Sequence, residues 1–181
     1  YTIYSGVQFF ARMEVKDALS YLRLIAFKDD LSFLRVANQP KRNLGERRMR
    51  FLQEYAARHG CTLFEALERT AEDEIFQRTG AKRLLSLIGR FHARYAEMPV
   101  SELLSAVLDE SGYEMMLRTG GSQERLDNLA ELKQAIHEYE VTCGEESTLE
   151  SYLSHIAMMT SADAASRRNA VKLMTVHAAK G

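Results

Sequence analysis

The scarcity of proline is the feature that most constrains the fold of this chain. Among the 181 residues only Pro40 and Pro99 are proline, so few positions interrupt a helix by removing a backbone N–H group. The chain is also rich in Leu, Ala, Glu and Arg, which favour helix. Hydrophobic residues make up 46% and charged residues 27%, as in an ordinary globular chain. We therefore expect a mainly α-helical fold.

Hydrophobic spacing and capping residues place the expected helices. Val15, Ala18 and Leu22 recur at helical spacing and predict a helix with one buried stripe over residues 14–26. Thr62 with Glu65, and Ser147 with Glu150, have the spacing of capping boxes, which begin helices. Asp29 or Asp30 is expected to cap a short helix, Ser101 to open one, and Ser122 to cap a long one. The expected helices span residues 30–37, 46–58, 81–97, 101–111, 122–141 and 148–159, with a further short helix after Thr62 and a loop over residues 160–170.

The two ends of the chain read differently from its middle. Residues 1–4 and 171–176 alternate in polarity, which predicts two short strands. The second strand runs into Thr175, His177 and Lys180, and ligands often bind at strand ends in α/β proteins. The helical middle therefore reads as an insertion, with boundaries near residues 27 and 170.

A basic segment is the first candidate binding site. Over residues 38–58 there are six Lys or Arg and two acids, a local charge of +4 in a chain whose net charge is −1. Pro40 and Gly45 interrupt helical structure here, so the next helix would begin with free N–H groups that can bind phosphate. A solvated helix face is the alternative interpretation. The candidate residues are Lys41, Arg42, Asn43, Leu44, Gly45 and Arg47.

A glycine pair marks the second candidate. Gly120, Gly121, Ser122 and Arg125 surround the start of another expected helix, which again offers N–H donors. Taken alone, these residues favour a simple capped loop over a binding site. The charged residues Arg12, Glu14, Lys16 and Asp17 are read as structural.

Other kinds of site lack their sequence signals. Cys61 and Cys143 have no CxxC partner, which favours free thiols in a reducing cytoplasm. The five histidines lack ligand spacing, so no metal site is expected. We find no catalytic constellation, no signal peptide and no apolar run long enough for a membrane span.

Three runs carry a resemblance to a known family. The run VKLMTVHAAKG resembles motif V of the UvrD/Rep/PcrA-like superfamily 1 DNA helicases, and YTIYSGVQFFARMEVKDALSYLRLI resembles motif IV. The run DDLSFLRVANQPKRNLGERR resembles the segment that follows motif IV. The resemblance implies a helical 2B subdomain at residues 27–169, bracketed by parts of a RecA-like 2A subdomain at residues 1–26 and 170–181. It also implies that the chain is part of a larger protein.

The resemblance further implies a function. The parent would be an ATP-dependent 3′–5′ DNA helicase that uses ATP and Mg²⁺, neither of them bound by this chain. The family usually reads Pro-x-Arg-Gly-Ile-Gly where this chain has Asn43 and Leu44 in place of Gly and Ile, and that block grips the duplex backbone. Thr175, His177 and Lys180 would contact single-stranded DNA. The expected partners are duplex and single-stranded DNA, the other helicase subdomains and regulatory proteins, with no membrane. The alternative is a helical interaction or autoinhibitory module that docks an acidic partner.

The sequence makes one prediction about activity. It contains no GxxxxGK[ST] run, the loop whose N–H groups cradle nucleotide phosphates. We expect the purified 181 residues to neither bind nor hydrolyse ATP. Phosphate release, with a P-loop helicase as the positive control, measures the hydrolysis. Turnover that co-purifies with the chain through successive columns would contradict this prediction.

Overall fold

The computed structural model describes residues 6–168, and every regular element in this range is a helix. This confirms the mainly helical expectation. The two predicted strands, at residues 1–4 and 171–176, lie outside the described residues. The helices are α1 (Gly6–Phe10), α2 (Met13–Phe27), α3 (Asp30–Val36), α4 (Glu46–His59), α5 (Leu63–Thr70), α6 (Ala81–Arg94), α7 (Val100–Glu110), α8 (Tyr113–Thr119), α9 (Gln123–Cys143) and α10 (Leu149–Arg168), with short 3₁₀ turns at Glu74–Phe76, Tyr95–Glu97 and Gly144–Glu146.

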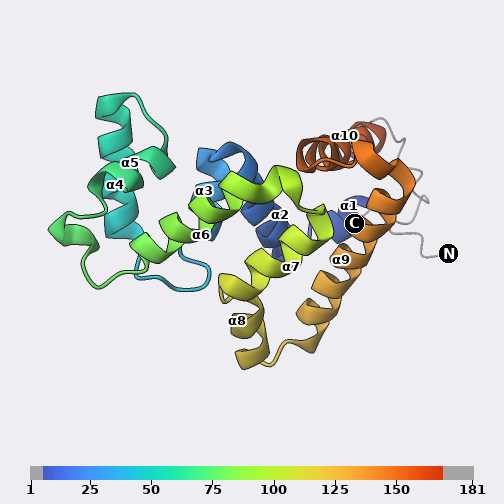
Figure 1. Ribbon diagram of the computed structural model, residues 1–181, viewed down its shortest axis with the longest axis horizontal. Helices are drawn as coiled ribbons and strands as arrows, with labels where there is room; N and C mark the ends of the chain where they lie inside the picture. Colours follow the sequence, from blue (N-terminus) through green and yellow to red (C-terminus); the bar gives the residue numbers. More distant parts are fainter. Residues whose placement is uncertain (1–5, 169–181) are drawn as a thin grey trace, which may run out of the picture.

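Helix α2 lies at the centre of the arrangement. In Figure 1, α4 and α5 occupy one end of the long axis, α9 and α10 the other, and α2, α6 and α7 cross the middle. Helix α2 packs against α3, α6, α7, α9 and α10. Because neighbours surround it, burial extends well beyond the single expected stripe. Helix α2 and the helical middle share one hydrophobic core, while the subdomain boundary near residue 27 stays a prediction.

Two carboxylates on α2 are buried together with their partners. Asn128 of α9 donates to Glu14 at 2.5 Å, and the Tyr113 hydroxyl of α8 donates to Asp17 at 2.6 Å. Arg35 of α3 lies 2.7 Å from the other Asp17 oxygen. Burial and the bond to Asp17 raise the pKa of Tyr113. A buried charge is tolerated when it is paired, so this cluster is structural, as expected.

Helix starts follow local capping chemistry in most places. Thr62 and Glu65 form the predicted capping box, and Asp29 accepts from the Ser32 N–H group, which makes it the cap of α3. The predicted box at Ser147 is wrong by one residue, since Thr148 accepts from the Ser151 N–H group at 3.1 Å. Ser122 precedes α9 but makes no side-chain capping bond.

Two other expectations about the helices are wrong. Helix α10 continues to Arg168, so residues 160–168 are helical where a loop was predicted. The run of Ser and Ala there is compatible with helix, because alanine has the highest helix propensity. Helix α8, at residues 113–119, was not predicted because it has only two turns and its apolar pattern is too short to read.

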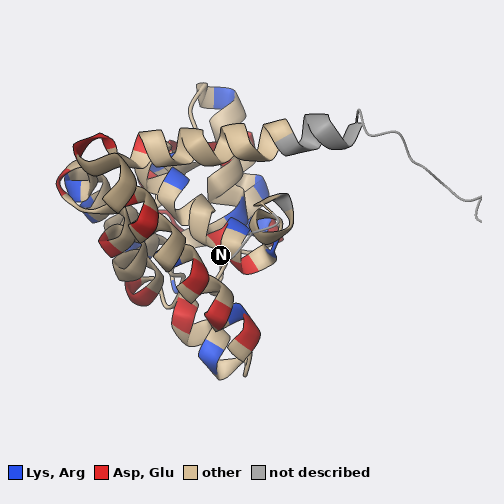
Figure 2. Ribbon diagram, turned by 90° about the vertical axis from the view of Figure 1, so that its right-hand side faces the viewer, with Lys and Arg blue, Asp and Glu red and all other residues tan. Residues whose placement is uncertain are grey.

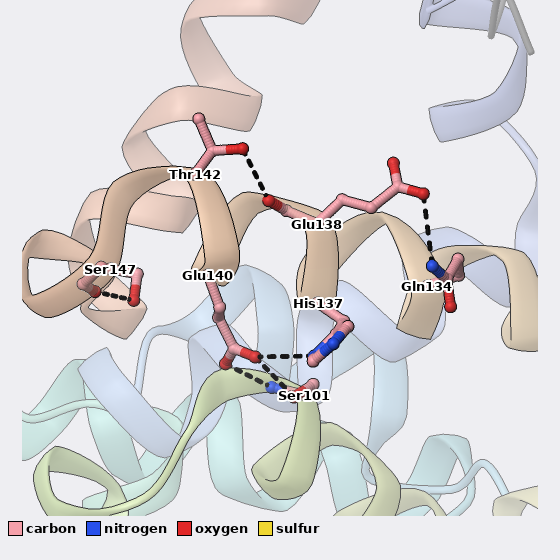
Figure 3. Close-up of polar contacts among 8 residues, drawn as sticks. Ser101, Gln134, His137, Glu138, Glu140, Thr142 and Ser147 are labelled. Carbon is pink, nitrogen blue, oxygen red and sulfur yellow. Dashed lines mark hydrogen bonds and ion pairs between the residues drawn. The ribbon is translucent and has the colours of Figure 1, made fainter. Parts of the chain in front are cut away.

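A carboxylate from α9 caps the start of α7 (Figure 3). Helix α7 begins at Val100, after Pro99, with no cap of its own. Glu140 accepts from the Ser101 N–H group at 2.9 Å and from the Ser101 hydroxyl at 2.6 Å. His137 lies 3.8 Å from the same carboxylate, whereas Glu138 points away toward Gln134. The cap of α7 is thus supplied by tertiary contact.

We predict that Glu140→Ala lowers the free energy of unfolding by about 1–2 kcal/mol, because it removes a helix cap. Urea unfolding followed by circular dichroism measures the change. Glu138→Ala is the matched control on the same helix, and we expect it to stay within about 0.5 kcal/mol of the parent. Equal losses in the two variants would show that the contact with Ser101 does not stabilise the fold.

Candidate nucleic-acid interface

The segment between α3 and α4, residues 38–45, is here called the basic loop. Its backbone is organised by Asn38, whose Oδ1 accepts from the Arg42 N–H group at 2.8 Å and the Leu44 N–H group at 3.1 Å. Leu44 is 1% exposed and joins the hydrophobic core. The loop is therefore tied down at both ends, and Leu44 serves as an anchor with its side chain turned away from solvent.

Asn43 supplies the left-handed residue that the basic loop needs. Its φ is +60°, a conformation that Asn tolerates better than most residues other than glycine. Its side chain donates to the Arg78 carbonyl at 3.4 Å and accepts from Arg48 at 3.4 Å. Gly45 has an ordinary φ of −76°. The special conformation thus falls at Asn43 and not at Gly45.

Arg42 points inward. Its guanidinium donates to the carbonyls of Val36 at 2.8 Å and Ala37 at 3.1 Å, at the end of α3. It also donates to the Tyr21 hydroxyl at 2.7 Å and lies 3.4 Å from the Ser111 carbonyl. The sequence predicted Arg42 as an exposed phosphate ligand, but in the structure it is half-buried and its Nη1 and Nη2 groups donate to protein acceptors.

A second segment, residues 77–80, lies against the basic loop and is here called the companion loop. The Gly80 N–H group donates to the Arg42 carbonyl at 2.8 Å. A Cβ added at Gly80 would lie 2.8 Å from the Arg42 Cβ, so only glycine permits this approach. This loop was not predicted from the sequence. Its signal was Arg78, Lys82 and Arg83 around Gly80, the same pattern of a breaker among basic residues as in the basic loop.

The two loops border a groove with a volume of about 970 Å³. Two of its cations have acidic partners, Arg90 with Glu110 at 2.9 Å and Lys82 with Glu72 at 2.9 Å. The groove is lined by the cations Lys41, Arg42, Arg78, Lys82, Arg83 and Arg90, and by two acids, Asp109 and Glu110. Within residues 6–168, no ion pair is seen for the side chains of Lys41, Arg78 and Arg83, and all three are exposed.

Positive charge gathers at the groove, whose lining holds six cations and two acids. On the side drawn in Figure 2, Lys and Arg are mixed with Asp and Glu and form no continuous basic band. Helix α6 begins beside the groove with Lys82 and Arg83 and without an acid in its first turn, although the positive end of a helix favours acids. A bound anion would compensate this arrangement, so the groove is suited to phosphate.

Comparison with known proteins shows the family of the chain. The whole chain, residues 1–181, matches the family described as the UvrD-like helicase C-terminal domain. The chain belongs to this family. DNA helicase II of Escherichia coli (strain K12) is 35% identical over 191 residues. The ATP-dependent DNA helicases PcrA of Staphylococcus epidermidis (strain ATCC 12228) and Staphylococcus aureus (strain Mu50) are 34% and 35% identical over 188 residues. The chain is covered in full each time but spans only 26% of the relative's length.

The other predicted residues of this UvrD-like domain do not join the groove. Arg47 is exposed in the first turn of α4 but does not line it. Gly120, Gly121 and Ser122 connect α8 to α9, at the far end of α8 from the groove, about 10 Å along a seven-residue helix. Arg125 lies 4.0 Å from the buried Glu14, so it is paired with an acid of the core. Thr175, His177 and Lys180 lie outside the described residues.

Between residues 6 and 168 there is no cluster of His, Cys, Asp or Glu that could hold a metal ion. None of the described helices is both long enough and apolar enough to cross a membrane. Cys61 and Cys143 are both free thiols.

We predict that Asn43 is required for its backbone conformation. Asn43→Val should lower the free energy of unfolding by about 1–2 kcal/mol, since a β-branched residue is strained at positive φ, whereas Asn43→Gly should change it by less than about 1 kcal/mol. Chemical unfolding measures both. Lys41→Val is the control, at an exposed position of the same loop whose φ is not positive. If Asn43→Gly were as damaging as Asn43→Val, the contacts of the Asn43 side chain would matter more than its φ.

Proposed function

We propose that this chain is the duplex-contacting part of an ATP-dependent DNA helicase. In this proposal the groove between the basic loop and the companion loop holds the phosphodiester backbone. The family and the names of the relatives, DNA helicase II and ATP-dependent DNA helicase PcrA, support the parent activity. ATP and Mg²⁺ would be used by other parts of the parent, and this chain would supply the grip on DNA.

The observation that carries the proposal is the convergence of three cations that form no ion pair within residues 6–168. Lys41 comes from the basic loop, Arg78 from the companion loop and Arg83 from the first turn of α6, and all three line one groove. Such contacts neutralise phosphates without reading bases. Arg78 has a φ of +59°, and its carbonyl accepts from Asn43, so the backbone that presents it is fixed by the basic loop.

In this proposal the remaining predicted residues make additional contacts with DNA outside the groove. The α8–α9 connection at Gly120 and Gly121 lies one length of α8 from the groove and would contact a neighbouring part of the DNA backbone. Thr175, His177 and Lys180 would contact single-stranded DNA, as the resemblance to motif V implies. The division into 2A and 2B subdomains belongs to the same proposal.

We predict weak, sequence-independent binding of duplex DNA by the 181-residue chain, with a dissociation constant of about 10⁻⁴–10⁻⁶ M near physiological salt. The plot of log K against log salt has a negative slope. Lys41→Ala, Arg78→Ala and Arg83→Ala should each reduce the magnitude of that slope by about 0.9, because each variant loses one phosphate contact. Fluorescence anisotropy of two labelled duplexes of unrelated sequence, over a full salt titration, measures both quantities.

Arg58→Ala is the matched control for these variants. Arg58 is exposed near the opposite end of α4, about 20 Å along the helix from the basic loop, and its loss should leave the salt slope unchanged. If the three groove variants bound duplex as the parent does, the groove would not be the DNA site. An acidic protein partner would then become the better explanation of its charge.

A further inference from the structure

We propose that Arg42 is a positioning residue, which with Tyr21 latches the basic loop to the core and makes no phosphate contact of its own. This inference rests on the proposed duplex site and specifies how that site is held in shape. Arg42 lies in the basic segment over residues 38–58, and the sequence predicts it as a phosphate ligand.

Both terminal nitrogens of the Arg42 guanidinium donate to the protein. Nη1 donates to the carbonyls of Val36, Ala37 and Gln39 at 2.8, 3.1 and 3.4 Å. Nη2 donates to the Tyr21 hydroxyl at 2.7 Å and to the Ser111 carbonyl at 3.4 Å. The carbonyls that end α3 carry the negative end of its dipole, which favours a cation there. A side chain engaged in this way has little left to offer a phosphate.

Tyr21 is the fixed point of the latch. It is fully buried on α2, and its hydroxyl donates to the Gln39 carbonyl while it accepts from Arg42. One hydroxyl therefore holds the start of the basic loop and the guanidinium at once. Burial raises the pKa of Tyr21, which keeps the proton that the bond to Gln39 requires.

The backbone of Arg42 joins the two loops. Its N–H group donates to Asn38 within the basic loop, and its carbonyl accepts from Gly80 of the companion loop. The contact is close, since a Cβ at Gly80 would meet the Cβ and Cγ of Arg42 at 2.8 and 3.0 Å. Movement of Arg42 would therefore displace Lys41 on one side and Arg78 on the other, which are the residues proposed to contact phosphate.

The latch is tested first without DNA. Tyr21→Phe keeps the ring and every charge but removes the hydroxyl that binds Arg42 and Gln39. We expect amide exchange at Leu44 and Gly80 to rise by about fivefold or more, the equivalent of about one hydrogen bond. Tyr113→Phe is the matched control, because Tyr113 is equally buried but its hydroxyl binds Asp17. Equal exchange at these two amides in the two variants would overturn the latch.

Duplex binding then separates positioning from contact. Tyr21→Phe should weaken binding by about threefold or more while Tyr113→Phe does not, although both lose a buried hydrogen bond. Arg42→Lys should bind as poorly as Arg42→Ala, because an ammonium cannot span the carbonyls and the hydroxyl as a planar guanidinium does. If Arg42→Lys bound like the parent and Tyr21→Phe had no effect, Arg42 would be a phosphate ligand and the inference would be wrong.

The two proposals fail in different ways. Failure of the duplex site appears as unchanged binding in Lys41→Ala, Arg78→Ala and Arg83→Ala. Failure of the latch appears as unchanged amide exchange at Leu44 and Gly80 in Tyr21→Phe, a measurement that needs no DNA. The first result leaves the latch standing as a structural device, and the second leaves the duplex site standing with Arg42 as one more contact.

Discussion

The rest of the structure depends on a polar stripe along the buried helix α2. Glu14, Asp17 and Tyr21 are spaced by three and four residues, so they lie on one face of the helix. Each is buried and therefore requires a hydrogen-bonding partner from elsewhere in the fold. Asn128 satisfies Glu14, Tyr113 and Arg35 satisfy Asp17, and Arg42 satisfies Tyr21. The apolar contacts of α2 supply most of the burial, and this stripe fixes which segments lie where.

The same stripe connects the core to the candidate site. Asp17 binds Tyr113, which follows Gly112 at the edge of the groove, and Tyr21 binds Arg42, which lies in the basic loop. The rings of Tyr21 and Tyr113 also meet edge to face, with centroids 6.1 Å apart. A surface loop without regular secondary structure can thus present charge in a defined direction, because buried groups beneath it determine its path. Preorganisation of this kind reduces the entropy that a binding surface loses on contact with its partner.

Local chemistry made much of the fold predictable. The Thr62–Glu65 capping box, the cap at Asp29 and the apolar spacing of α2 depend only on residues within a few positions of one another, and they are found where the sequence predicts them. The cap of α7 was not predictable, because Glu140 lies 39 residues from Ser101. The continuation of α10 through residues 160–168 was missed since small residues are compatible with both helix and loop.

The sequence by itself determined the helical class, the family and the presence of a basic segment. Only the tertiary structure decided which cations are free. Arg42 and Arg78 each lie two residues from a helix-breaking Pro40 or Gly80. Arg42 nevertheless turns inward to α3, α2 and the end of α7, whereas Arg78 is exposed at the groove. The physical reason is that a buried hydroxyl and helix-end carbonyls require a donor. The segments that supply those acceptors, at Tyr21 and Ser111, lie 21 and 69 residues away along the chain.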